Sequence, residues 1–323
     1  GEIDTATEIL SGMGDHPFVS QQFNNGNIDP RLLAADMLHR ILMGPAEQAR
    51  GADRAALLAE AYEMPYLPLV SGEASGRFSP VLYQRWAEQV NPGDDPASFP
   101  PMVRMGIGQI KTQLGATPAS EVIYLSQNTP LSGIAIPAER ERESARRVAL
   151  VDEAKAQFAQ AIAYNETLIG EEVEETVRAL GLMNLGFDKY YLAEMDNHVF
   201  GAGQQAAYIE VAKLWATIGL ELPDTEQAEQ AMGFAMALYQ VADNNHNAGP
   251  AGVTNTDYRE GYRQVAETMY EYWPNHDTAN NLRVYTGFYL YELSGQLDKA
   301  AEIYRGTPSS HPSYFEARRQ MVL

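Results

Sequence analysis

Residues 281–312 read NLRVYTGFYLYELSGQLDKAAEIYRGTPSSHP, and their pattern is the clearest indication of the fold. Its first half carries apolar and aromatic residues at helical spacing as far as Tyr291, and Gly295 then interrupts the pattern. In the second half Ala300 and Tyr304 stand four residues apart, so both lie on one face of a helix. Pro312 closes the segment, because proline cannot continue a helix. The stretch predicts two paired helices, over 279–293 and 297–306.

Two other segments share these features. One is a helix expected over 257–272, preceded by a first helix over 225–243. Gly233 lies in that first helix, and a residue without a side chain is expected where two helix backbones approach each other. The other segment runs over 151–161 and has the pattern of a second helix, without a convincing first helix before it.

The rest of the chain is helical wherever a pattern is clear, so the predicted fold class is all-α. Alternation of polar and apolar residues is scarce, and the one candidate strand, 121–125, has neighbours that favour a helix. Residues 1–138 are irregular, with loops rich in proline and glycine, while 139–323 form a near-continuous series of helices. Further helices are expected over 101–115, 118–127, 141–168, 171–195 and 204–218.

The segment 281–312 resembles the tetratricopeptide repeat (TPR). In that family a small residue lets the second helix press against the first, a bulky ring follows one turn later, and a proline ends the unit. Ala300, Tyr304 and Pro312 occupy those places, whereas Val284 replaces the usual Trp, and Gly-Phe at 287–288 replaces Leu-Gly. The resemblance covers about half of the chain and implies an antiparallel helix-hairpin solenoid. The alternative is a helical bundle in which these residues fall at such spacings by chance.

The resemblance also implies a concave face lined by the first helix of each unit. In the last unit that face is expected to include Leu282, Tyr285, Tyr289 and Glu292. Members of the family that capture acidic peptide termini use Lys, Arg and Asn there, so the Tyr and Glu of this chain favour a basic, Pro-rich or sugar-like partner. The alternative for Tyr285 and Tyr289 is that they pack in the core.

Composition excludes several classes of function. The 323 residues include 23 basic and 43 acidic side chains, and the net charge of −20 repels nucleic acid and anionic lipid. No stretch approaches the roughly 18 apolar residues of a membrane span. Cysteine is absent, which excludes disulfides and thiolate chemistry but is compatible with a bacterial envelope compartment, which we prefer, or with the cytoplasm. The helix pattern at 313–323 stops abruptly, so we expect a piece of a longer protein.

No catalytic motif emerges from the sequence, and we expect neither enzymatic activity, nor a cofactor, nor a metal. The six histidines never stand at metal-ligand spacing, and no glycine pair continues as a phosphate-binding fingerprint. The leading hypothesis is therefore a non-enzymatic scaffold that binds another protein or peptide through a TPR-like concave surface. An all-α enzyme that uses tyrosine and carboxylate chemistry is a weaker alternative.

A second hypothesis is a glycan- or solute-binding protein of the bacterial envelope. The SusD-like glycan-binding proteins join TPR-like helices to a long irregular region that bears aromatic platforms, and this chain is similar in that arrangement. Tyr83 and Trp86, between Pro-rich loops, would supply the platform.

Overall fold

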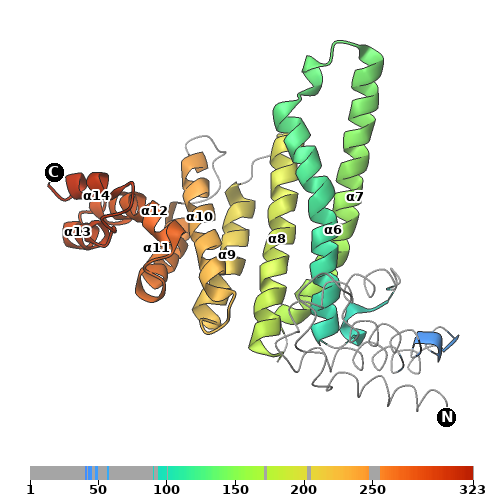
Figure 1. Cartoon of the computed structure of the whole chain (residues 1–323), viewed down its shortest axis with the longest axis horizontal. Helices are drawn as coiled ribbons and strands as arrows, with labels where there is room; N and C mark the ends of the chain where they lie inside the picture. Colours follow the sequence, from blue (N-terminus) through green and yellow to red (C-terminus); the bar gives the residue numbers. More distant parts are fainter. Residues whose placement is uncertain are drawn as a thin grey trace, which may run out of the picture. The chain divides into compact units, whose positions relative to one another are not determined.

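The computed structural model describes residues 94–99, 101–170, 173–201, 205–246 and 255–322, with isolated positions at 41, 43–45, 48, 49, 57 and 90. Every regular element among these residues is helical, and the described part of the chain contains no strand (Figure 1). The predicted all-α fold class is confirmed for that part. None of the described helices combines the length and the apolar character that crossing a bilayer requires.

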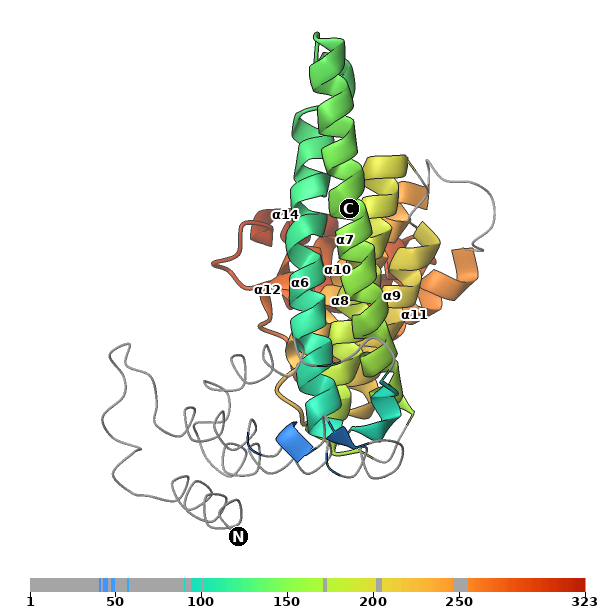
Figure 2. The ribbon, with the colours of Figure 1, turned by 90° about the vertical axis from the view of Figure 1, so that its right-hand side faces the viewer.

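The chain divides into two compact units. One consists of Gly1–Gly115 with Ala156–Val173, and the other of Ala116–Lys155 with Glu174–Leu323. Two long helices, α6 (Pro101–Asn128) and α7 (Pro137–Ile169), contribute a part to each unit. Within each unit these parts run antiparallel and side by side, as the two views show (Figures 1 and 2).

The described residues of the first unit bury an apolar seam between α6 and α7. A short 3-10 helix, η1 (Pro96–Ser98), precedes α6, and the ring of Phe99 then packs 6.1 Å from that of Tyr164 on α7. The buried apolar residues of the seam include Val103, Ile107, Ile110, Phe158, Ala161 and Leu168.

Helix α6 passes through Pro118 without a break, so the expectation of separate helices over 101–115 and 118–127 was wrong. Proline removes one backbone hydrogen bond and its ring crowds the preceding turn, which is why the sequence suggested an interruption. Pro118 and the adjacent Ala119 are both buried, so packing of this part of α6 offsets the local cost.

The second unit begins with the other parts of α6 and α7. The 3-10 helix η2 (Leu131–Gly133) lies in the connection between them, and an ion pair joins Arg146 to Glu121 across the two helices. Helix α8 (Glu175–Phe200) belongs to this unit and ends at Gly201, whose φ of 68° places it in the left-handed region that suits glycine.

A series of shorter helices completes the second unit. Each contacts the next along the chain, and contacts also join α9 to α11, α10 to α12, and α12 to α14. In order they are α9 (Gln205–Glu221), α10 (Ala228–His246), α11 (Asn255–Tyr272), α12 (Asp277–Thr286), the π-helix η3 (Gly287–Glu292), α13 (Leu297–Arg305) and α14 (Tyr314–Gln320).

The segment 281–312 forms a helix hairpin. Helix α12 continues directly into η3, and α13 packs back against both. Ala300 is 2% exposed and Tyr304 is 1% exposed, so the prediction that these two residues face the preceding helix is confirmed. The ring of Tyr304 lies against Gly287, where an added Cβ would stand 2.3 Å from a ring carbon. The hairpin can close this tightly because residue 287 has no side chain.

Gly233 has a different neighbour from the one expected. A Cβ added at Gly233 would lie 2.5 Å from the imidazole of His276, rather than against the backbone of another helix. His276 is the N-cap of α12, and its Nδ1 accepts a hydrogen bond from the backbone N–H of Thr278 at 3.1 Å. The missing side chain therefore makes room for a capping ring.

Candidate functional site

The four residues expected on the concave face lie on the continuous helix formed by α12 and η3. Leu282 and Tyr285 belong to α12, and Tyr289 and Glu292 belong to η3. The rings of Tyr285 and Tyr289 are in contact, with centroids 4.5 Å apart. Leu282 and Tyr285 are partly buried, while Tyr289 remains 38% exposed.

Tyr289 is the exposed end of a row of tyrosines that crosses three helices. Tyr239 of α10 lies 6.3 Å from Tyr262 of α11, and Tyr262 lies 5.7 Å from Tyr285 of α12. Tyr239 and Tyr262 are buried, so the row leads from the core to the surface. Packing of this kind holds a ring in place and leaves one face available for contact.

A groove of about 320 Å³ lies beside Tyr289, between α11 and the end of η3. We call it the Tyr289 groove. Leu290 and Leu293 give it apolar walls, and its remaining lining residues are Arg259, Glu260, Arg263, Ser294 and Gln296. It combines one exposed aromatic face, two leucines and several hydrogen-bonding groups.

The charges beside the groove are largely paired. The guanidinium of Arg263 donates a hydrogen bond to the carboxylate of Glu260 at 2.5 Å and another to that of Glu267 at 3.0 Å. The hydrogen bond from Arg263 stabilises the ionised carboxylate of Glu260 and so lowers its pKa. Glu267 also accepts a hydrogen bond from the hydroxyl of Tyr291 at 2.9 Å. Such exposed pairs add little to stability, but they fix the positions of the side chains that form the wall.

Glu292 and Leu282 do not line the groove. The carboxylate of Glu292 accepts a hydrogen bond from the hydroxyl of Tyr304 at 2.7 Å, which directs it toward α13. Of the four expected residues, the structure therefore brings Tyr285 and Tyr289 together and lines the groove with Tyr289. Tyr83 and Trp86, the expected aromatic platform, lie outside the described residues.

Sequence reasoning missed the groove residues of α11 and those that follow η3. Arg259 and Arg263 stand about 30 residues before Tyr289 and carry no local motif. Leu293, Ser294 and Gln296 lie at a helix end, where they have the appearance of ordinary capping and turn residues. Only the folding of α11 against the end of η3 makes them neighbours.

Comparison with known proteins found no matching family model, no similar curated protein and no similar solved structure. Within the described residues, no three His, Asp or Glu side chains gather as a metal site would require. What the Tyr289 groove offers is a ring face, apolar contact area and hydrogen-bonding groups. These features suit the binding of a short polypeptide segment.

Proposed function

We propose that this protein is a non-enzymatic interaction scaffold, built of TPR-like helix hairpins, which holds a Pro-containing peptide in the Tyr289 groove. The observation that carries the proposal is the row of packed tyrosines that ends in a half-exposed ring on the wall of a groove. A ring held in this way loses little conformational freedom when a partner packs on it.

The order of helix contacts supports a TPR-like arrangement. Helix α10 contacts both α11 and α12, and α12 contacts both α13 and α14, so each first helix contacts its own partner and the next first helix. Pro274 and Pro312 stand at the ends of the two helix hairpins, the first formed by α10 and α11 and the second by α12, η3 and α13. These are features of a solenoid in which each hairpin packs on its neighbours.

The π-helix accounts for a departure from the TPR pattern. The glycine at 287 stands one position earlier than in the family, and the π-helix begins at this residue. A π turn takes one more residue than an α turn, as in the hydrogen bond from the N–H of Leu293 to the carbonyl of Phe288. Gly287 and Tyr291, four residues apart, both face α13.

A Pro-rich segment fits the groove because proline packs flat on an aromatic ring and is already extended before it binds. Leu290 and Leu293 beside Tyr289 supply the apolar contacts on either side of such a segment. The net charge of −20 also attracts a peptide whose flanks are basic, through the long-range field of the chain. The expected partner is thus a Pro-containing peptide with basic flanks.

Selection from a phage-displayed library of random peptides tests the proposal. We expect the full chain to enrich Pro-containing peptides, and Tyr289→Ala to weaken a selected peptide by about tenfold or more, as the loss of a central aromatic contact does. Tyr272→Ala is the matched control, because Tyr272 is exposed and does not line the groove. It should leave the Kd, measured by fluorescence anisotropy, within about twofold.

Two results would contradict the proposal. One is a selection that enriches no peptide above a blank surface. The other is a selected peptide whose Kd is the same for the wild type and for Tyr289→Ala, provided that circular dichroism shows both proteins folded.

A further inference from the structure

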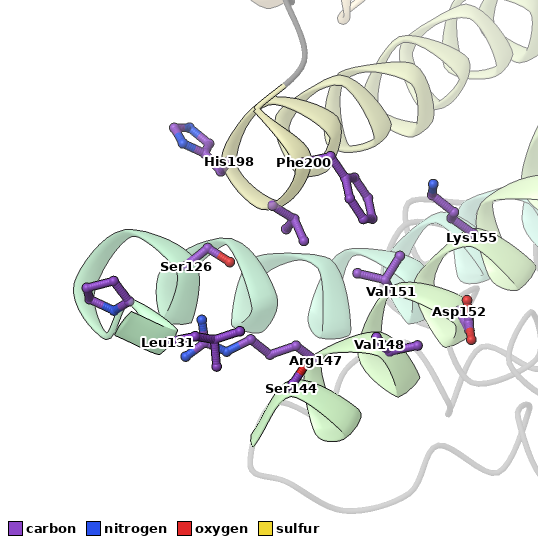
Figure 3. Close-up of a pocket in the computed structure, with 12 residues that line it drawn as sticks. Ser126, Leu131, Ser144, Arg147, Val148, Val151, Asp152, Lys155, His198 and Phe200 are labelled. Atoms are coloured by element: carbon purple, nitrogen blue, oxygen red, sulfur yellow. The ribbon is translucent and has the colours of Figure 1, made fainter. Parts of the chain in front are cut away.

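A second concavity lies in the second unit, where the end of α8 meets the adjacent parts of α6 and α7. Its volume is about 560 Å³, within the usual range of small-molecule sites. Figure 3 shows Phe200 at the end of α8 facing Val151 and Val148 of α7. We call it the tip pocket, and its other lining residues are Ser126, Pro130, Leu131, Ser144, Arg147, Asp152, Lys155, His198 and Val199.

The walls of the tip pocket are apolar and incompletely covered. Val148 and Phe200 are each 58% exposed, although both flank the concavity, while Val151 between them is buried. Exposed large apolar side chains grouped around a hollow mark a binding surface more often than isolated ones do. A ligand body placed here would remove the faces of Val148 and Phe200 from water.

Arg147 brings a buried positive charge to the Leu131 end of the tip pocket. Its side chain is only 7% exposed, and Figure 3 shows it extending toward Leu131. Its Nε donates to Glu143 at 3.0 Å and its Nη2 donates to the carbonyl of Thr129 at 2.6 Å. Among the described residues, nothing accepts a hydrogen bond from its Nη1. The guanidinium is therefore anchored on two sides, and the two N–H bonds of Nη1 are left to donate.

Lys155 and His198, two further polar residues of the tip pocket, are held by neighbours. Lys155 pairs with Asp196 at 3.6 Å, and its ammonium lies 5.0 Å from the centre of the Phe200 ring. Nε2 of His198 lies 3.4 Å from Oε2 of Glu194 and 3.0 Å from Nε2 of Gln127. Asp152 adds a carboxylate at the Lys155 end. The Arg147 end is thus where the pocket offers an anion a buried donor in a fixed position, whereas the side chain of Lys155 is 45% exposed.

We infer that the tip pocket binds a small amphipathic carboxylate. Its carboxylate accepts from Nη1 of Arg147, and its hydrocarbon body lies along Val148, Val151 and Phe200. A single negative charge is specified because the carboxylate of Glu143, 3.0 Å from Nε of Arg147, repels a doubly charged group such as phosphate more strongly. Ser144 lines the pocket one helical turn before Arg147 and offers its hydroxyl as a second donor.

Decanoate and 1-decanol, titrated into the full chain by isothermal calorimetry, test the inference. The two probes have the same chain length and differ in charge, and a pocket that is merely apolar prefers the alcohol, which costs less to remove from water. We expect decanoate to bind at least about tenfold more tightly than decanol, because a hydrogen bond to a charged acceptor is stronger than one to a neutral group. The variant Arg147→Met should abolish that preference.

A matched pair of variants locates the site. Phe200→Ser should weaken decanoate about tenfold or more by removing the apolar wall, whereas Phe315→Ser should have no effect. Phe315 is exposed and does not line the pocket. The inference is overturned if decanol binds the wild type as well as decanoate does, if decanoate shows no saturable binding, or if the two variants behave alike. If Arg147→Met fails to fold, the affinities of decanoate and decanol for the wild type still test whether the pocket prefers a carboxylate.

Discussion

Replacing Tyr304 with alanine is expected to lower the free energy of unfolding of the second unit by about 3–5 kcal/mol, the usual cost of deleting a buried aromatic ring. The ring packs with Tyr291, Ala300 and Ala317 in one buried cluster, and its hydroxyl donates to Glu292 at 2.7 Å. The substitution therefore creates a cavity and also leaves a half-buried carboxylate without its donor. Urea denaturation followed by circular dichroism measures the change.

A double-mutant cycle with Gly287→Ala isolates the contact between the two helices. In the wild type the new Cβ would meet the ring of Tyr304 at 2.3 Å, so Gly287→Ala should cost about 1–3 kcal/mol through overpacking. In the Tyr304→Ala background the ring that the new Cβ would meet is absent. Gly287→Ala should then be neutral or stabilise the helix by up to about 1 kcal/mol, because alanine favours a helix more than glycine does.

Gly133→Ala is the control for the cycle, because no atom lies within 4 Å of its added Cβ. It should change stability by no more than about 0.5 kcal/mol in either background. If the effects of Gly287→Ala and Tyr304→Ala simply add, the close approach at residue 287 does not hold the hairpin together.

Between pH 10 and 12 the second unit is expected to lose on the order of 5 kcal/mol of stability per pH unit and to unfold, because each buried tyrosine contributes up to about 1.4 kcal/mol per unit. Burial raises the pKa of Tyr190 and of Tyr239 to about 12. Burial also raises the pKa values of Tyr270, Tyr291 and Tyr304.

The direction of this effect follows from which state binds the protons. An unfolded tyrosine ionises near pH 10, whereas a folded one with a raised pKa keeps its proton. Above pH 10 the unfolded chain therefore gains free energy that the folded chain does not, and stability falls until the folded pKa is passed. Below pH 10 these tyrosines are protonated in both the folded and the unfolded state, so they do not make the free energy of unfolding depend on pH.

Free energies of unfolding at several pH values, together with absorbance at 295 nm, measure this loss. Tyrosinate should form in the same transition that removes the helical signal. Tyr239→Phe deletes one titrating group, so the slope between pH 10 and 12 should fall by about 1.4 kcal/mol per unit. Phe315→Ala, which removes an exposed ring without a titrating group, should leave the slope unchanged. Ionisation of all tyrosines near pH 10 without loss of helix would contradict the expectation.

Helix positions followed from the sequence because each depends on a local pattern. The expected ranges 225–243 and 297–306 agree with Ala228–His246 and Leu297–Arg305 to within three residues at each end. The inward faces of Ala300 and Tyr304 followed in the same way, since residues four apart share a helix face. Among the expected site residues, the contact between Tyr285 and Tyr289 has the same origin.

Other features were decided by groups far apart in the chain. Pro118 sits inside α6 because burial there outweighs a local penalty, and the space at Gly233 is filled by His276, a ring from 43 positions further on. The groove residues of α11 have no signal of their own, because their role arises only when η3 packs beside them.

Local patterns were therefore enough for the all-helical character of the described chain, for the approximate positions of most of its helices and for the buried faces of the 281–312 hairpin. Periodicity and capping act over a few residues and can be identified without coordinates. Coordinates were needed to place Tyr289 and Arg259 on the walls of one groove, and Arg147 and Phe200 on the walls of one pocket. Those placements depend on how helices pack, and packing is a balance over many distant side chains that no short pattern encodes.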